Sequence, residues 1–264
     1  VEESGEPDRA SGEIDKFSRS PYLRHVDYIT ISGGEPTLRR DLPEVFGVLH
    51  RNIPQAQFNM TTHGMDPDWT EELFRKTLEA NPGIRFGRVG LSLNGPPEIH
   101  DASRGMPGAF AKVVETHRRL QGLVPCAFSF TFFRDNVDHF AWAQEFAREK
   151  GSFCYICWTV MNERFNAEDK DLVFWQPGMD TMLNDFVKNL QQFPGTCLGG
   201  LKNLKNLPEG IGKGYLYDSI VNRRIMPCYA GRQIVHVLPN GDVYPCNFKM
   251  TEDRLLGNLR RQSF

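Results

Sequence analysis

The sequence predicts an α/β fold in which parallel strands alternate with helices. Short apolar runs typical of buried strands are separated by segments with helical spacing of their apolar residues. Near the end of the chain this pattern changes to a tight turn between two strands. A closed or partial parallel barrel and an open sheet both fit this pattern, and periodicity alone does not choose between them.

The expected elements follow one another in regular alternation. Strands are expected at residues 28–31, 57–61, 89–93, 128–133 and 153–160. Helices are expected at residues 13–20, 42–49, 68–78, 110–120 and 182–190, with one more running to Phe146 from an N-cap at Asp135 or Asn136. In a parallel sheet built this way, functional groups gather at the carboxyl ends of the strands.

The C-terminal part carries a different motif. Asn240-Gly241 lies between the apolar runs 233–238 and 243–244, which strongly indicates a β-hairpin. The stretch 195–214 is rich in glycine, asparagine, lysine and leucine and indicates a loop or insertion. We therefore expect an α/β domain at residues 1–195, a linker or insertion with a helix at residues 196–227, and a small further domain at residues 228–264.

Composition narrows the class of protein. The formal net charge of −2 argues against a nucleic-acid partner, because such proteins carry a basic patch. No apolar run approaches the ~20 residues that a bilayer requires, so no membrane-spanning segment is expected. Six cysteines without a secretory signal favour a reducing compartment, and a cytoplasmic location is expected.

Several strand ends carry candidate binding residues. Gly33-Gly34-Glu35 follows the first strand and offers exposed backbone and a carboxylate to a cation. Ser92 and Arg104 flank the segment after the third strand, where a hydroxyl and a guanidinium can converge on one carboxylate. Each motif also has a plain structural reading, namely a tight turn for the glycines and a surface ion pair of Arg104 with Asp101.

The cysteines fall into two groups. Cys228 and Cys246 flank the hairpin, an arrangement that can hold zinc or an iron–sulfur cluster, although two unrelated buried thiols are the alternative. Cys154 and Cys157 form a CxxC inside a strand, which points residues i and i+3 to opposite faces. Those two are expected to be core thiols, and Cys126 and Cys197 are given the same interpretation.

Taken together and in order, these motifs resemble the radical S-adenosylmethionine (SAM) superfamily over residues 27–264, and within it the subgroup with a SPASM or twitch extension. Gly33-Gly34-Glu35 matches its GGE motif, and residues 100–105 are similar to its HDxxRG stretch. Cys228, Gly241 and Cys246 fit the opening C-x(9–15)-G-x(4)-C of the extension, and residues 256–259 resemble its lGN stretch. The resemblance implies a partial parallel (β/α)6-type TIM-like barrel followed by a small hairpin-containing domain.

The resemblance also implies roles for individual residues. Gly33, Gly34 and Glu35 receive the ammonium group of SAM, and Ser92 and Arg104 hold its carboxylate. Thr62-His63-Gly64 is similar to the family's Thr-Asn-Gly with His63 in place of the asparagine, and Asn94 and His63 are candidates for contacts with the ribose or the substrate. Cys228 and Cys246 belong to the ligand set of an auxiliary iron–sulfur cluster.

One departure from the family pattern concerns its defining CxxxCxxC motif, which binds the [4Fe-4S] cluster. No cysteine precedes Cys126 in this chain. We expect the motif, with the first barrel strand, to lie upstream of Val1, and the remaining cysteines of the extension to lie beyond Phe264. On that expectation the chain by itself is inactive.

The function implied by the resemblance is reductive cleavage of SAM to a 5′-deoxyadenosyl radical, which abstracts a hydrogen atom from the substrate. The substrate cannot be identified, and a peptide or protein is one class that relatives use. An electron donor such as flavodoxin or ferredoxin is the expected partner. The alternative is a catalytically inactive barrel that binds SAM or a partner protein. An aldolase-like barrel ranks last, because no lysine follows the strands and the histidines are scattered.

Overall fold

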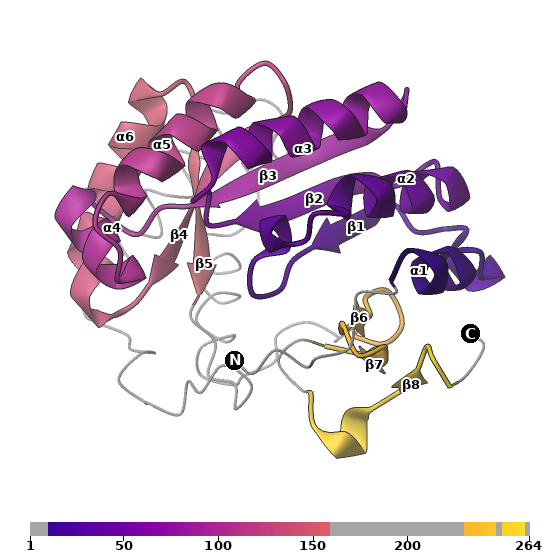
Figure 1. Cartoon of the computed structure of the whole chain (residues 1–264). Coiled ribbons are helices and arrows are strands. Elements are labelled where there is room, and N and C mark those ends of the chain that lie inside the picture. The colour runs from indigo at the N-terminus through magenta and orange to yellow at the C-terminus, as the bar shows by residue number, and fades with distance from the viewer. Residues whose placement is uncertain (1–9, 159–229, 247–249, 262–264) are drawn as a thin grey trace, which may run out of the picture. The chain divides into compact units, whose positions relative to one another are not determined.

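The computed structural model describes residues 10–158, 230–246 and 250–261 (Figure 1). Residues 10–158 hold α1 (Ala10–Ser18), β1 (Tyr28–Ile31), α2 (Leu42–Asn52), β2 (Gln57–Thr62), α3 (Pro67–Ala80), β3 (Arg85–Ser92), α4 (Pro97–Arg104), α5 (Ala109–Leu120), β4 (Cys126–Phe132), α6 (Phe140–Glu149) and β5 (Cys154–Trp158). Short 3-10 helices occur at Pro21–Leu23, Pro36–Leu38 and Arg134–His139. The C-terminal residues form a separate small sheet.

The described strands β1 to β5 form one parallel sheet in consecutive order. Ile31 pairs with Met60, Met60 with Val89, and Leu91 with Phe128, so the carboxyl ends of neighbouring strands lie along one edge. This confirms the expected α/β fold, and each strand was predicted to within a few residues. The loops at that edge carry most of the candidate residues, as in other parallel sheets.

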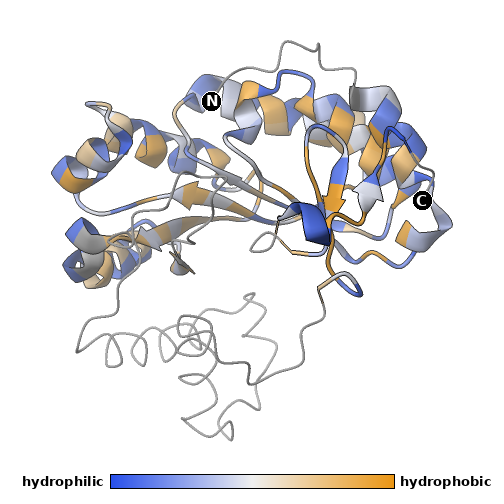
Figure 2. Ribbon diagram, turned by 90° about the horizontal axis from the view of Figure 1, so that it is seen from below, coloured by the Kyte–Doolittle hydropathy of each residue, from blue (hydrophilic) through white to orange (hydrophobic). Residues whose placement is uncertain are grey.

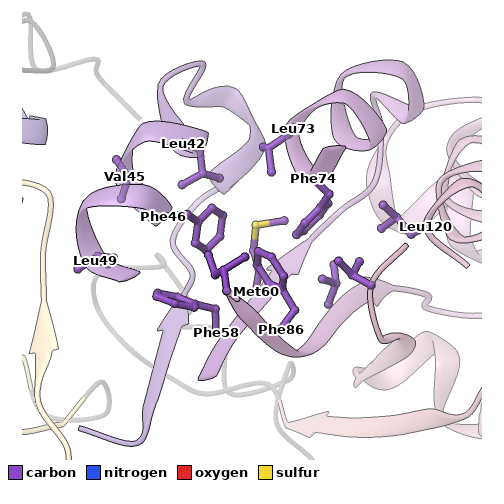
Figure 3. Packing of buried hydrophobic residues seen from close by; sticks show 13 residues of the cluster. Leu42, Val45, Phe46, Leu49, Phe58, Met60, Leu73, Phe74, Phe86 and Leu120 are labelled. Atoms are coloured by element: carbon purple, nitrogen blue, oxygen red, sulfur yellow. The ribbon is translucent and has the colours of Figure 1, made fainter. Parts of the chain in front are cut away.

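One face of the sheet packs against the helices through an apolar core. Phe46 of α2 and Phe74 of α3 meet Phe58 of β2 and Phe86 of β3, and Figure 3 shows these rings gathered around Met60. Phe46 lies edge-on to Phe58 and to Phe86, with ring centroids 5.5 and 5.2 Å apart, a preferred geometry for aromatic pairs. Figure 2 shows hydrophobic and hydrophilic residues alternating along the helices, as expected when one helical face is buried.

The opposite face of the sheet is polar. In β2 the buried Phe58, Met60 and Thr62 alternate with half-buried Gln57, Asn59 and Thr61. The alternation follows from the two-residue period of a strand, which sends successive side chains to opposite faces. The two faces of the same sheet therefore present different chemistry, and the polar one bears hydroxyl and amide groups.

The start of the helix that ends near Phe146 differs from the prediction. Residues Arg134–His139 form a 3-10 helix, and α6 begins only at Phe140. Asn136 is fully buried and its amide is used elsewhere: Oδ1 accepts from Phe133 N, and Nδ2 donates to Asn94 O and Thr131 O. Asn136 therefore ties the end of β4 to the loop after β3 instead of capping α6, a tertiary role that local helix signals do not reveal.

The C-terminal residues form a three-stranded sheet of β6 (His236–Val237), β7 (Asp242–Tyr244) and β8 (Gly257–Asn258). Leu238 N donates to Asp242 O at 2.8 Å, and Gly241 adopts a φ of 86°, so the predicted hairpin turn is confirmed. The predicted helix at 182–190 and both expected domain boundaries lie outside the described residues. Among the described helices, none combines the length and apolar character needed to cross a membrane.

Candidate functional site

Glu35 connects the carboxyl ends of β1 and β2. Its Oε1 accepts hydrogen bonds from Thr37 N at 3.0 Å, Thr37 Oγ1 at 2.7 Å and Thr62 Oγ1 at 2.6 Å. Its Oε2 accepts from His63 N at 2.7 Å, and its side chain is only 5% exposed. A carboxylate has about four acceptor sites, so these four contacts occupy most of the capacity of Glu35, and Oε2 accepts only one of them. Glu35 thus fixes the loop geometry and has little capacity left for the ammonium group expected from the sequence.

The neighbouring glycines leave the backbone accessible. Gly33 has a φ of 149°, and a Cβ atom built on Gly33 or Gly34 would meet no other atom within 4 Å. Pro36 then starts the 3-10 helix Pro36–Leu38, with Glu35 as its N-cap. The carbonyl groups of Gly33 and Gly34 are therefore the better candidates for an ammonium group in this segment.

His63 is held in its neutral form. Burial, the largest cause, lowers the pKa of His63, the charge of Glu35 raises it, and the charge of Arg104 lowers it further. Its Nδ1 accepts from Met65 N at 3.1 Å, so the ring proton is on Nε2. The 3.3 Å approach of Nδ1 to Glu35 Oε2 is therefore not an ion pair near neutral pH.

Arg104 reaches the same site from the last turn of α4. Gly105 ends this helix in the left-handed conformation, with a φ of 62°, which glycine adopts without strain. Burial lowers the pKa of Arg104, and the nearby charge of Glu35 opposes that shift. Its buried Nε has no hydrogen-bond partner among the described residues. Because an arginine stays charged in proteins, this donor is available to an anion.

The surface ion pair between Asp101 and Arg104, which was the alternative interpretation of this motif, does not form among the described residues. Asp101 instead accepts from Gly108 N at 2.6 Å and Phe110 N at 2.7 Å, and these bonds keep its pKa low. Asp101 therefore caps the first turn of α5. The sequence reading missed α4 as a helix, although its position explains how Arg104 comes close to Glu35 and His63.

A hollow of about 290 Å³ lies beside these groups. It is lined by Thr37, Leu38, Arg40, His63, Met65, Asp66, Arg104 and Met106. A guanidinium donor, a neutral imidazole and a threonine thus share a small, partly enclosed space. This arrangement can bind a small molecule with a carboxylate, since arginine pairs strongly with that group.

Ser92 and Asn94 lie at the end of β3 and just beyond it. Ser92 is half-buried and pairs with Ser129 of β4. Asn94 is 6% exposed; its N donates to His100 Nδ1, its Nδ2 donates to Ser103 Oγ, and its buried Oδ1 has no partner among the described residues. No hydrogen bond joins Ser92 to Arg104 in the described part of the chain, whereas the charge of Arg104 affects His63 and that of Glu35 affects Arg104.

The described cysteines do not form a metal or cluster site. Within residues 10–158, 230–246 and 250–261 no group of three possible ligands gathers around one point. Burial raises the pKa of Cys126 to about 11 and raises those of Cys154 and Cys157, which fits core thiols and not thiolate ligands. Cys246 is half-buried, and Cys228 lies outside the described residues.

Two segments of the chain match known protein families. Residues 12–147 match the radical SAM superfamily, and residues 228–264 match SPASM, an iron-sulfur cluster-binding domain. Both agree with the resemblance seen in the sequence motifs.

Two curated relatives come from Methanosarcina barkeri (strain Fusaro). Fe-coproporphyrin III synthase is 36% identical over 110 residues, which is 41% of this chain and 26% of the relative. AdoMet-dependent heme synthase is 24% identical over 257 residues, which is 89% of this chain and 66% of the relative. The chain thus spans from about a quarter to about two thirds of the curated relatives it matches.

A solved structure described as native anSMEcpe with bound AdoMet and Kp18Cys peptide has a similar fold. The superposition covers 96% of this chain and 70% of that chain, with a TM-score of 0.59 and 19% sequence identity. At this identity the likeness supports the fold alone.

Proposed function

Because this chain belongs to the radical SAM superfamily, we propose that it forms the SAM-binding part of an enzyme that abstracts a hydrogen atom from its substrate. A peptide is one candidate substrate class, since the similar solved structure contains one. The curated relatives suggest tetrapyrrole chemistry as another. When bound, the [4Fe-4S] cluster supplies the electron that cleaves SAM.

The residues of this chain do not hold that first cluster. Its six cysteines contain no CxxxCxxC, and the described residues gather no three ligands. No chemical step is therefore assigned to the cluster through these residues. An auxiliary cluster at Cys228 and Cys246 remains part of the proposal, supported by the SPASM match.

SAM, in contrast, fits the residues present. Arg104 is the observation that carries the proposal, because its buried Nε has no partner among the described residues and its side chain lines the hollow. Arg104 binds the carboxylate, and the carbonyl groups of Gly33 and Gly34 accept from the ammonium group. Glu35 and Thr62 hold the two loops in place, and neutral His63 offers its Nε2 proton to the ribose or to the substrate.

Replacing Arg104 tests this assignment. In the full-length protein with its cluster, Arg104→Ala should weaken SAM binding about ten- to a hundredfold, as expected for a lost hydrogen bond to a charged group. Arg104→Lys should lose less, because the charge remains while the bidentate geometry is lost. Equilibrium dialysis with labelled SAM measures both effects.

The matched control is Arg118→Ala, which removes an exposed arginine that pairs only locally with Glu115. Its SAM affinity should equal that of the unaltered protein. An unchanged affinity in Arg104→Ala would remove Arg104 from the site. An inactive homologue would bind SAM in the same way but contain no iron and show no visible charge-transfer absorbance, which separates the two functions.

A further inference from the structure

A second arginine, Arg88 of β3, lies against the aromatic ring of Tyr155 of β5. Its guanidinium carbon is 4.0 Å from the ring centroid. Stacking of this kind fixes the plane of the guanidinium group but uses none of its N–H donors. The edge of the group is therefore oriented and remains available for hydrogen bonds.

Arg88 has no carboxylate partner in the part of the chain that the structure describes. No hydrogen bond or ion pair of Arg88 is recorded among the described residues, whereas Arg39 and Arg119, also partly buried, each pair with a carboxylate. Partial burial removes some of the hydration of the guanidinium group, and a hydrogen-bond acceptor compensates for that loss. Its charge therefore calls for an anion that the described residues do not supply.

Tyr155 is positioned by contacts that reach across the sheet. The side chains of Ser129 on β4 and Thr61 on β2 oppose the effect of burial on the pKa of Tyr155, so its hydroxyl group lies near both strands. A Cβ atom at Gly90 of β3 would lie 2.0 Å from the hydroxyl oxygen, so only glycine leaves room for the ring in this place. Burial also raises the pKa of Tyr155, which keeps the hydroxyl protonated.

We propose that Arg88 and Tyr155 form a subsite on the polar face of the sheet that binds a carboxylate group of the substrate. The proposal rests on the proposed function, in which Arg104 already holds the carboxylate of SAM, and it adds the chemical class of the second molecule. Arg88 supplies paired N–H donors to the carboxylate, and the Tyr155 hydroxyl offers a further donor beside them. Substrates without an anionic group should bind poorly.

Cys157 offers a way to test this subsite. Its Sγ lies 3.2 Å from Ser129 Oγ, and the charge of Arg88 influences its pKa, so the thiol is close to the proposed subsite. Iodoacetate carries a carboxylate and iodoacetamide is its neutral analogue of similar size. The ratio of the iodoacetate rate to the iodoacetamide rate at Cys157 therefore reports how strongly the site attracts a carboxylate. A change in the reactivity of the thiol affects both rates equally and cancels in the ratio.

The experiment uses the full-length protein, with labelling at Cys157 followed by peptide mass spectrometry. Arg88→Gln should lower the rate ratio about tenfold, and Arg88→Lys should preserve most of it because the charge remains. Succinate should protect Cys157 in the unaltered protein but not in Arg88→Gln, and neutral succinamide should protect neither. The control is Arg85→Gln on the same strand, whose exposed guanidinium donates to the Gln55 carbonyl and should not affect the ratio.

A rate ratio in Arg88→Gln equal to that of the unaltered protein would overturn the proposal. SAM binding is measured on the same variant and should be unchanged. If SAM binding fell instead, Arg88 would hold the carboxylate of SAM, and the substrate subsite would be wrong. Alkylation of Cys157 does not need SAM cleavage, so this test and the Arg104 test have independent outcomes. Either proposal can fail while the other holds.

Discussion

The two faces of the five-stranded sheet differ although the same strands build both. On the helix-covered face Phe58 and Phe86 are buried in the same apolar cluster. Their side chains carry no polar group that would need a hydrogen-bond partner. On the polar face Arg88 and Tyr155 are held by a few directed contacts, and Arg88 has no anionic partner among the described residues. The apolar face contributes mainly to stability, and the polar face carries the charged group for which we propose a ligand.

The largest expected effect is on the apolar face. Phe46→Ala should lower the free energy of unfolding by about 3–5 kcal/mol, because it removes a fully buried ring and leaves a cavity between Phe58 and Phe86. Chemical denaturation measures the change. The control is Tyr28→Ala on β1, whose ring is 66% exposed and whose loss should matter far less. Similar losses in both variants would show that the packing around Phe46 is not the main source of stability.

A titrating group on the apolar face should give the next largest effect. His117 of α5 is 2% exposed and stacks on Phe128 with ring centroids 4.4 Å apart. Burial, followed by the charge of Lys150, lowers the pKa of His117 from 6.5 to about 4. The unfolded chain therefore binds a proton more readily, and stability falls as the pH drops from about 6.5 to about 4, by an amount on the order of 3 kcal/mol.

Comparing variants isolates this contribution. Below about pH 4 His117 is protonated in both the folded and the unfolded state, so the loss of unfolding free energy stays constant. Above about pH 6.5 His117 is neutral in both states and the loss is absent. His117→Leu should have a shallower decrease of the unfolding free energy between pH 6.5 and 4.5 than the unaltered protein, in denaturation series at several pH values. His100, whose pKa burial also lowers to about 4, accounts for part of the remaining slope. Parallel slopes for the two proteins would contradict the buried, neutral state of His117.

The smallest effect concerns the polar face. Gly90→Ala should destabilise the protein by about 1–3 kcal/mol, because the new methyl group meets the Tyr155 hydroxyl. In a Tyr155→Leu background the same substitution should cost much less, and a double-mutant cycle measures the coupling between the two sites. Gly12→Ala on α1 is the control: nothing lies within 4 Å of its new Cβ, and stability should rise slightly. If the effects of Gly90→Ala and Tyr155→Leu on the unfolding free energy were additive, Tyr155 would not lie over Gly90.

The sequence predicted the strands well because each is a short apolar run bounded by turn residues. Tyr28–Ile31 agrees with β1 at both ends, and the hairpin turn at Gly241 was predicted from its flanking residues. Arg104 was expected to act together with Ser92 after the third strand, and that role stays a prediction. The predicted start of α6 was wrong, because the side-chain amide of Asn136 donates to the carbonyl groups of Thr131 and Asn94 and does not cap the helix.

Other features could not be predicted from local patterns. Glu35 suggested a ligand contact, but Thr62 and His63 occupy its carboxylate from a different loop. In the sequence Tyr155 is one more aromatic residue of a buried strand, whereas in the fold its hydroxyl lies over Gly90. Such contacts join residues 27 to 65 positions apart, and no short sequence window contains both partners.

The sequence by itself determined the alternation of strands and helices, the hairpin at its end and the order of the family motifs, because these depend on residue type and short spacing. Only the tertiary structure decided which polar groups are already paired and which are left for a ligand. That distinction depends on contacts between distant segments, which set the partners of Glu35 and leave Arg88 and Arg104 without an acceptor among the described residues. The physical reason is that a polar side chain gains its role from the partners that folding brings to it.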